Sequence, residues 1–319
     1  MKKALKITGK VLLWILGIIV GLVIISAVTH NILKPIEKNK YEIGQTINIE
    51  GQDMQAYVTG SGEKTIVLLS GLGTASPITD FMPLAERLSE DYKVVILEYF
   101  GYGFSDTTKK ERSNENIVNE IREALKELEI SGPYILMPHS ISGVYSLYYA
   151  INYPNEVEAI IGIDESRPNQ TKTNKYENMS PSLALLNTLG IIRDITFLLP
   201  NVDDGMNENN FYSAEQVKFK KIATAWNSVN TSVINEMNMV NTNTKELYDM
   251  KYPNDLPVLS FLAKDTVDTD NEWLSLHEEV ISNSTIQKIE TLRGGHYLHW
   301  TNADKIAEIT KEFISTRLK

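Results

Sequence analysis

Residues 134–143 read YILMPHSISG, an apolar run followed at once by a short turn that carries Ser140. The run Tyr134–Met137 is typical of a strand covered on both faces, and helical spacing from Ser142 to Tyr153 predicts a helix after the turn. A serine on so tight a turn projects its hydroxyl away from the sheet, beside the backbone N–H groups of the helix N-terminus. The stretch therefore predicts a nucleophilic serine, with a helix-capping serine as the alternative interpretation.

Short apolar runs and helical segments alternate on both sides of this turn. The predicted strands are Thr46–Ile49, Met54–Val58, Thr65–Leu69, Lys93–Leu97, Tyr134–Met137, Ala159–Ile163, Val258–Leu262 and Ile286–Glu290. The predicted helices are Phe81–Leu88, Glu115–Leu128, Ser142–Tyr153 and Ala303–Thr316. This alternation predicts an α/β protein with a mainly parallel eight-stranded sheet and helices on both faces.

Residues 166–255 interrupt the alternation. The stretch is rich in Asn and has no run typical of a buried strand, whereas Ser182–Leu199 and Ala214–Met239 have helical spacing. A structureless loop of this length is improbable inside a compact domain. We therefore expect a helical cap inserted at 166–255 into a core formed by 45–165 and 256–319. Within it, the apolar run Leu183–Pro200 indicates either packing on the core or an apolar acyl pocket.

The N-terminal leader differs from the rest of the chain. Residues 11–28 carry no charge and would span about 27 Å as a helix, close to the thickness of a bilayer core. Four lysines precede them, which favours a cytoplasmic N-terminus. The sequence thus predicts a cytoplasmic tail (1–10), a transmembrane anchor (11–29) and a polar tether (30–44), giving a single-pass cell-membrane protein with an extracytoplasmic body. A cleaved signal peptide and a buried core helix are the alternatives.

Composition excludes several classes of function. The chain has 319 residues, no cysteine and a formal net charge of −10. Thiol catalysis, disulfides and cysteine-ligated metals are therefore excluded, and the acidic balance argues against nucleic acid as a partner. There is no phosphate-binding loop after the first strand and no paired histidine at ligand spacing, so neither a cofactor nor a metal is predicted.

Three motifs occur in a characteristic order. They are Ser70–Gly73 (SGLG) after the third predicted strand, Glu98–Ser105 (EYFGYGFS) after the fourth, and His139–Gly143 (HSISG) after the fifth. In this arrangement the body, over 45–165 and 256–319, resembles the α/β-hydrolase fold. It departs from the family's usual motifs at Ser70, Glu98, Phe100, Pro138 and Ser142. The resemblance implies that the backbone N–H groups of Leu72 and Ile141 form an oxyanion hole beside Ser140.

A serine hydroxyl needs a base, and the chain has five histidines. His296 follows Gly294–Gly295, between the last predicted strand and the final helix, where the family has its catalytic histidine. We expect His299 to be a packing or polar residue and His277 to lie on the surface. His30 lies beside the anchor. His139 is next to Ser140 in sequence, and we expect it to point elsewhere.

The base in turn needs a carboxylate. Asp265 follows the strand Val258–Leu262, although Leu262 replaces the family's usual glycine. The order Ser140, Asp265, His296 matches the family's order of serine, acid and histidine. The remaining acidic candidates are Asp268, Asp270, Asp164 and Glu165, of which the last two end the preceding strand, where some relatives carry the acid.

The fold alone does not determine the reaction. Haloalkane dehalogenases and epoxide hydrolases of this family use an aspartate at the position of Ser140, so the serine argues against both. The sequence predicts an ester hydrolase that works through an acyl-enzyme, of the carboxylesterase or lipase type, with a hydrophobic acyl small molecule as substrate. One alternative is an aminopeptidase of the proline-iminopeptidase type, with Glu215, Glu236 or Glu246 binding the amine. Another is a membrane-anchored binding module without catalysis.

Overall fold

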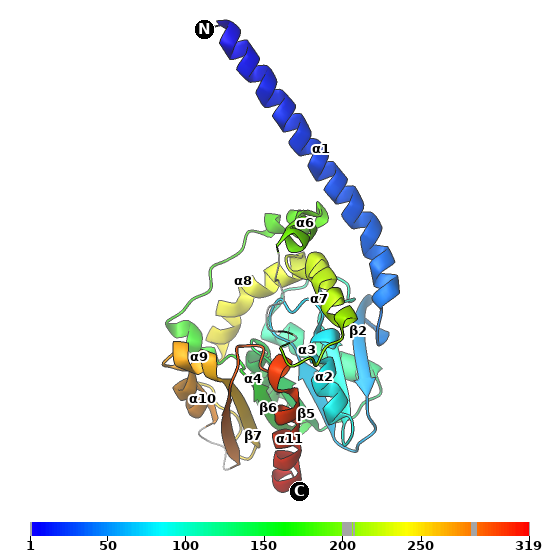
Figure 1. Ribbon diagram of the computed structural model, residues 1–319. Coiled ribbons are helices and arrows are strands. Elements are labelled where there is room, and N and C mark those ends of the chain that lie inside the picture. The colour runs from blue at the N-terminus through cyan, green and yellow to red at the C-terminus, as the bar shows by residue number, and fades with distance from the viewer. Residues whose placement is uncertain (1, 200–205, 207, 282–285, 319) are drawn as a thin grey trace.

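The computed structural model describes residues 2–199, 206, 208–281 and 286–318. Its centre is an eight-stranded sheet in the order β1-β2-β4-β3-β5-β6-β7-β8 (Figure 1). The pairs β1–β2 and β2–β4 are antiparallel and the remaining pairs are parallel. The predicted fold class, a mainly parallel sheet with helices, is confirmed.

The elements lie close to their predicted positions. The strands are β1 Gln45–Ile49, β2 Gln52–Thr59, β3 Thr65–Leu69, β4 Lys93–Glu98, β5 Tyr134–Pro138, β6 Val157–Ile163, β7 Val258–Ala263 and β8 Gln287–Leu292. The helices of the core are α2 Pro77–Leu88, α3 Asn114–Glu127, α4 Ser142–Asn152, α9 Lys264–Thr269, α10 Trp273–Ile281 and α11 His299–Arg317. Helix α2 starts four residues earlier than predicted, because proline suits the first position of a helix.

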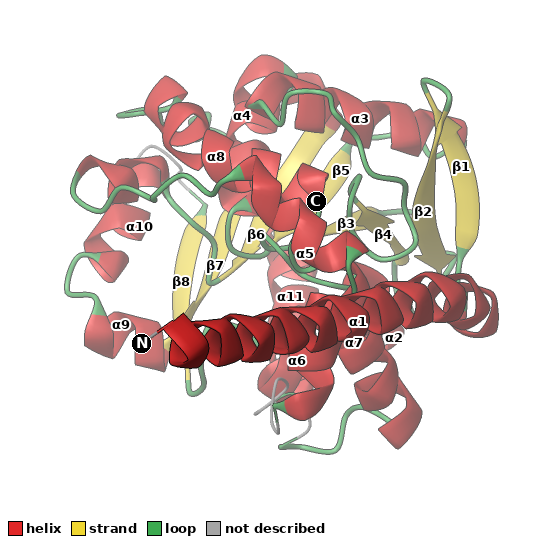
Figure 2. Cartoon of the chain, turned by 90° about the horizontal axis from the view of Figure 1, so that it is seen from above, coloured by secondary structure: helices red, strands yellow, loops and turns green. Residues whose placement is uncertain are grey.

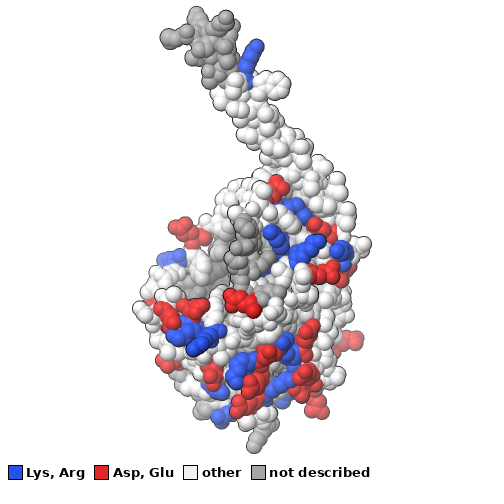
Figure 3. All heavy atoms as spheres, viewed as in Figure 1, with Lys and Arg blue, Asp and Glu red and all other residues white. Residues whose placement is uncertain are grey.

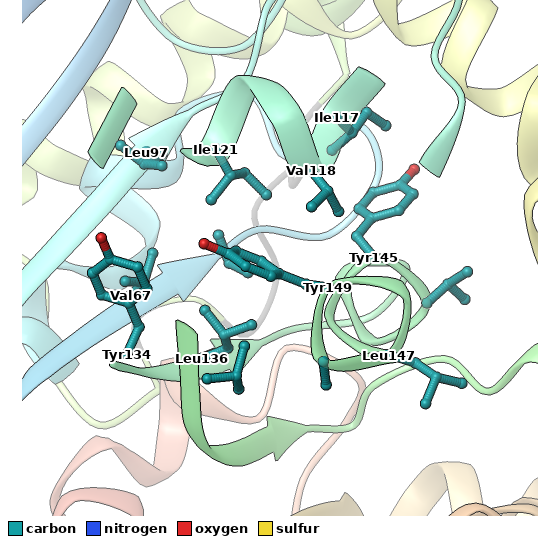
Figure 4. Close-up of a cluster of buried hydrophobic side chains, with 14 of the residues drawn as sticks. Val67, Leu97, Ile117, Val118, Ile121, Tyr134, Leu136, Tyr145, Leu147 and Tyr149 are labelled. Atoms are coloured by element: carbon teal, nitrogen blue, oxygen red, sulfur yellow. The ribbon is translucent and has the colours of Figure 1, made fainter. Parts of the chain in front are cut away.

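Alternate strand residues face two separate cores. Val67 of β3 and Leu136 of β5 pack with residues of α3 and α4, among them Ile121 and Tyr149 (Figure 4). Their neighbours in sequence, such as Ile66, pack with α2 and α11 on the opposite face. Burial on both faces explains why these strands are continuous apolar runs in the sequence.

The residues between β6 and β7 form helices above the sheet. They are the 3₁₀ turns η2 Pro168–Lys172 and η3 Pro181–Leu183 and the helices α5 Ala184–Thr188, α6 Ile191–Leu198, α7 Ala214–Asn227 and α8 Thr231–Glu246. No strand occurs among the described residues of 166–255. Pro200, at the end of the apolar run noted above, lies outside the described residues. At the end of α7, Asn227 donates to the carbonyl oxygens of Ala75 and Gly103, so the cap covers the loops that follow β3 and β4.

Most of the segment predicted as a polar tether (30–44) is helical, because helix α1 runs without a break from Lys2 to Tyr41. Its last turns pack on the cap. Glu37 accepts hydrogen bonds from both Arg193 and Trp226, and the Tyr41 ring stacks on Phe219 with 5.0 Å between centroids. These contacts keep the segment helical. Among the described residues, α1 is the one helix with the length and apolarity that a membrane crossing needs, which a signal sequence also has.

Glu98, one of the departures from the family's motifs, is a buried carboxylate at the end of β4. It accepts hydrogen bonds from the N–H groups of Ile78 and Phe104 and from the Ser76 hydroxyl. Burial nevertheless raises the pKa of Glu98 to about 7. A side chain at Gly103 would collide with this carboxylate, which explains the glycine there.

The raised pKa gives a pH-dependent contribution to stability. At pH values between its ordinary pKa and about 7, the Glu98 carboxyl keeps its proton in the folded state and loses it in the unfolded state. Its contribution to the free energy of unfolding therefore falls as the pH rises to about 7. We expect the Glu98→Gln variant to lack this fall, which is on the order of 3 kcal/mol between about pH 5 and pH 8. Denaturant unfolding in detergent across this range measures it. The exposed Glu127→Gln is the control, and a Glu98→Gln profile parallel to the wild type would contradict the assignment.

Candidate active site

The turn between β5 and α4 holds Ser140 in the left-handed region, with φ of 53°. This uncommon conformation for a non-glycine residue lifts the serine out of the strand direction. The backbone of Ser166 packs closely against the turn at Gly143, where an added Cβ would lie 2.6 Å from the Ser166 carbonyl oxygen. Ser142, which replaces a usual glycine, donates its hydroxyl to the Ser70 carbonyl. The substitution therefore ties the turn to the loop that follows β3.

Ser140 and His296 lie within hydrogen-bond distance, although 155 residues separate them in the chain. The Ser140 Oγ is 2.9 Å from Nε2 of His296, and Nδ1 of the same ring is 2.7 Å from Oδ2 of Asp164. The Ser140 side chain is half-buried and the His296 ring is partly exposed. The three groups form a continuous chain of hydrogen bonds that a small molecule can approach from the solvent.

The carboxylate that contacts His296 is Asp164. The prediction that Asp265 contacts this histidine is therefore wrong. Asp164 directly follows β6, the strand next to β5, whereas Asp265 lies exposed in the first turn of α9. No hydrogen bond joins the Asp265 side chain to His296 within the described chain. Asp265 instead takes part through its backbone, since its N–H donates to the Gly294 carbonyl before the histidine loop.

Both oxygens of the Asp164 carboxylate accept hydrogen bonds from neighbouring residues. Its Oδ1 accepts hydrogen bonds from the Ala263 N–H and the Trp273 indole, and its Oδ2 accepts one from the Thr266 hydroxyl. Burial opposes ionisation, but these bonds and the one from His296 keep the pKa of Asp164 below its ordinary value. The side chain is therefore an ionised, fixed acceptor that orients the imidazole.

The loop after β3 lies against the serine. A side chain at Gly71 would come within 2.9 Å of Ser140 Cβ and 2.8 Å of His139 Nδ1, so only glycine fits there. The Gly73 N–H donates to the Tyr102 hydroxyl, which fixes the loop just after Leu72. Within the described residues, neither the Leu72 N–H nor the Ile141 N–H has an intramolecular acceptor.

The remaining histidines are structural. His277 is fully buried, so the prediction of a surface position is wrong; its ring nitrogens face the carbonyl oxygens of Trp273 and Glu165. His299 is also buried, with its Nε2 2.8 Å from Asp80. His139 donates from Nε2 to the His296 carbonyl, and burial holds its pKa well below the ordinary value. This hydrogen bond from His139 to the His296 backbone helps to fix the position of His296.

Among the described residues, no group of three histidine, cysteine, aspartate or glutamate side chains is placed so that it could hold a metal ion.

Comparison with known proteins agrees with this fold. The sequence model of the α/β-hydrolase fold family matches residues 64–303, and the chain belongs to that family. It is 27% identical over 279 residues to the uncharacterized protein YbdG of Bacillus subtilis, with 85% of each chain covered. It is 28% identical over 102 residues to the putative carbamate hydrolase RutD of Pantoea ananatis, covering 32% of this chain and 36% of that one.

Solved structures of epoxide hydrolases have the same fold. A mutant epoxide hydrolase of Vigna radiata superposes with a TM-score of 0.66 at 14% identity, over 87% of this chain and 99% of that one. At this identity the likeness shows the fold alone. The residue on the turn here is Ser140.

Proposed function

We propose that the protein is a serine hydrolase that cleaves an ester through an acyl-enzyme. The observation that carries the proposal is the chain of hydrogen bonds from Ser140 through His296 to Asp164, at 2.9 and 2.7 Å. A serine and an imidazole at this distance, with a carboxylate behind the imidazole, are the arrangement in which the hydroxyl loses its proton as it attacks a carbonyl.

The steps follow from the positions of these groups. His296 Nε2 takes the Ser140 proton while Oγ bonds to the ester carbonyl carbon, and the N–H groups of Leu72 and Ile141 bind the oxyanion. His296 then gives the proton to the leaving alkoxide, the C–O bond breaks, and an acyl-serine remains. Water attacks the acyl-serine by the same route, with His296 as base, and releases the acid.

We further propose a hydrophobic acyl substrate and a membrane anchor at 11–29, with the body outside the cytoplasm. The charge-free window of α1 and the lysines before it support the anchor and its orientation. The apolar helices α5 and α6, close to that anchor, support an apolar substrate.

The carboxylates that a peptidase of the proline-iminopeptidase type would use are engaged elsewhere. Glu236 is fully buried and accepts hydrogen bonds from Tyr102 and Tyr145. Glu246 accepts one from Asn114, and exposed Glu215 pairs with Lys40. The buried contacts of Glu236 argue against its use to bind a free amine.

A fluorophosphonate probe tests the proposal, because it phosphonylates an activated serine. We expect the full chain in detergent to be labelled, and the Ser140→Ala variant to remain unlabelled while it folds like the wild type. A folded wild-type chain that does not react would favour the binding module. In the same preparation, p-nitrophenyl esters of increasing chain length test the acyl preference, and equal rates for short and long esters would contradict it.

A further inference from the structure

Exposed apolar side chains outside α1 gather in one part of the cap. Among the described residues, five of the eight exposed large apolar side chains beyond α1 lie on α5, on α6 and directly after it. We call them the apolar cap surface: Leu185, Ile195, Phe197, Leu198 and Leu199. Leu198 is 80% exposed. Patches of this kind on a folded domain mark an interaction site.

This surface lies beside the end of the charge-free part of α1. An added Cβ on Gly190, between α5 and α6, would lie 2.6 Å from the Ser26 carbonyl oxygen of α1. The Thr188 carbonyl accepts a hydrogen bond from Asn31 at 3.1 Å. Ser26 belongs to the last turn of the apolar window 11–28, so α5 and α6 begin where that window ends. Figures 1 and 2 show α6 at the top of the body, alongside α1.

The contact between α1 and the cap is fixed by a buried ion pair. Arg193 of α6 is 6% exposed and bonds to both carboxylate oxygens of Glu37, which also accepts the Trp226 indole N–H at 2.9 Å. Separation of such a pair would leave charges buried without a partner. The cap therefore keeps one orientation relative to the helix that we propose as the anchor.

We propose that the apolar cap surface inserts into the lipid bilayer that α1 crosses, at the boundary between headgroups and acyl chains. The inference rests on the membrane anchor of the proposed function and is independent of the chemistry at Ser140. A bilayer is the occupant that the geometry favours, because the surface is continuous with the apolar window of α1, none of which is buried inside the protein.

The chemistry of α6 fits this position. Ile195 and Leu198 are three residues apart on one face of α6, and Leu199 follows directly after the helix. Asp194 is the one exposed charged side chain in 184–199, because Arg193 is buried against Glu37. Lys221 lies 5.4 Å from the Phe197 ring, where an ammonium group can reach lipid phosphates from the edge of an apolar surface. Figure 3 shows few charged side chains on the top of the body to the left of α1.

Site-directed fluorescence on the full chain tests the inference, and the absence of cysteine allows one label at a time. Leu198→Cys and Leu185→Cys place a label on the apolar cap surface, and Val20→Cys places one in the apolar window of α1. Leu274→Cys is the control, because Leu274 is exposed on α10, a helix well below α6 in Figure 1. Each variant is labelled with nitrobenzoxadiazole and reconstituted into vesicles of phosphatidylcholine and phosphatidylglycerol. Quenching by a nitroxide-labelled phosphatidylcholine then reports lipid contact, and circular dichroism checks that each variant is folded.

We expect the labels at 20, 198 and 185 to be quenched severalfold more strongly than the label at 274. Strong quenching at 20 with labels at 198 and 185 no different from 274 would overturn the inference and leave the anchor intact. Quenching at none of the four positions would overturn the anchor and the inference together. Neither outcome depends on whether Ser140 reacts, so the proposed chemistry is tested separately.

Discussion

Replacement of Asp164 by asparagine should lower kcat/KM for a p-nitrophenyl ester by about 10⁴-fold, because the imidazole then loses the carboxylate that sets its tautomer and stabilises its positive charge. The amide keeps nearly the same shape, so the folded structure is retained. Asparagine can donate a hydrogen bond to Nδ1 of His296, which would place the proton on Nε2, the nitrogen that must accept it from Ser140. The measurement is steady-state hydrolysis by the full chain in detergent.

Asp265→Asn is the matched control, since this carboxylate is exposed and makes no hydrogen bond to His296 in the described structure. We expect this variant to stay within severalfold of the wild type. If Asp265→Asn lost the activity and Asp164→Asn retained it, the acid would be the one that the sequence order predicts. Circular dichroism of both variants separates loss of catalysis from loss of fold.

The contrast between these two aspartates shows what the sequence does and does not determine. Apolar runs such as Thr65–Leu69 predict the strands, because a strand buried on both faces is mostly apolar. Ser140 and His296 can be predicted because each has a local sequence signal. Ser140 lies on a tight turn between a strand and a helix, and His296 follows a pair of glycines. The acid has no such signal, since an aspartate after either of two neighbouring parallel strands reaches the same edge of the sheet.

Local backbone geometry decides between the two aspartates. Asp164 has a φ of 42°, its Oδ2 lies 2.7 Å from Nδ1 of His296, and four donors surround its carboxylate. None of these facts can be read from the order of residues. The helical segment at 30–41 was missed for a related reason. Its polar residues suggest a solvated tether, while their partners Arg193 and Trp226 lie more than 150 residues away in sequence.

Loss of the buried Arg112 should strongly destabilise the fold. Its guanidinium nitrogen NH1 lies 2.7 Å from both oxygens of Glu120, and the two side chains are 0% and 2% exposed. Arg112→Met leaves the Glu120 carboxylate buried without a counter-charge. We expect the free energy of unfolding to fall by about 3–5 kcal/mol, as measured by urea unfolding in detergent with tryptophan fluorescence.

A half-exposed pair provides the control. Arg122 also bonds to both oxygens of its partner, Glu156, but the two side chains are 31% and 35% exposed. Arg122→Met should cost about 1 kcal/mol or less, because water replaces the lost contact. Equal losses in the two variants would show that burial adds nothing to the Arg112 pair. The double variant Arg112→Met with Glu120→Leu should recover much of the loss, since it removes the unpaired charge.

The destabilisation should depend on pH, because burial already raises the pKa of Glu120 and of Glu236, and Arg112 opposes both shifts. Without the Arg112 guanidinium, both carboxyls hold their protons to higher pH in the folded state. The loss of unfolding free energy in Arg112→Met is therefore larger at pH 8 than at pH 5.

Glu236 accepts a hydrogen bond from the Tyr102 hydroxyl, and the oxygen of the same hydroxyl accepts one from the Gly73 N–H beside Leu72. The pair therefore supports the loop beside Ser140 as well as the fold, and at pH 8 ester hydrolysis by Arg112→Met should fall at denaturant concentrations that leave Arg122→Met active. Parallel inactivation of the two variants would break this link between the buried pair and the loop.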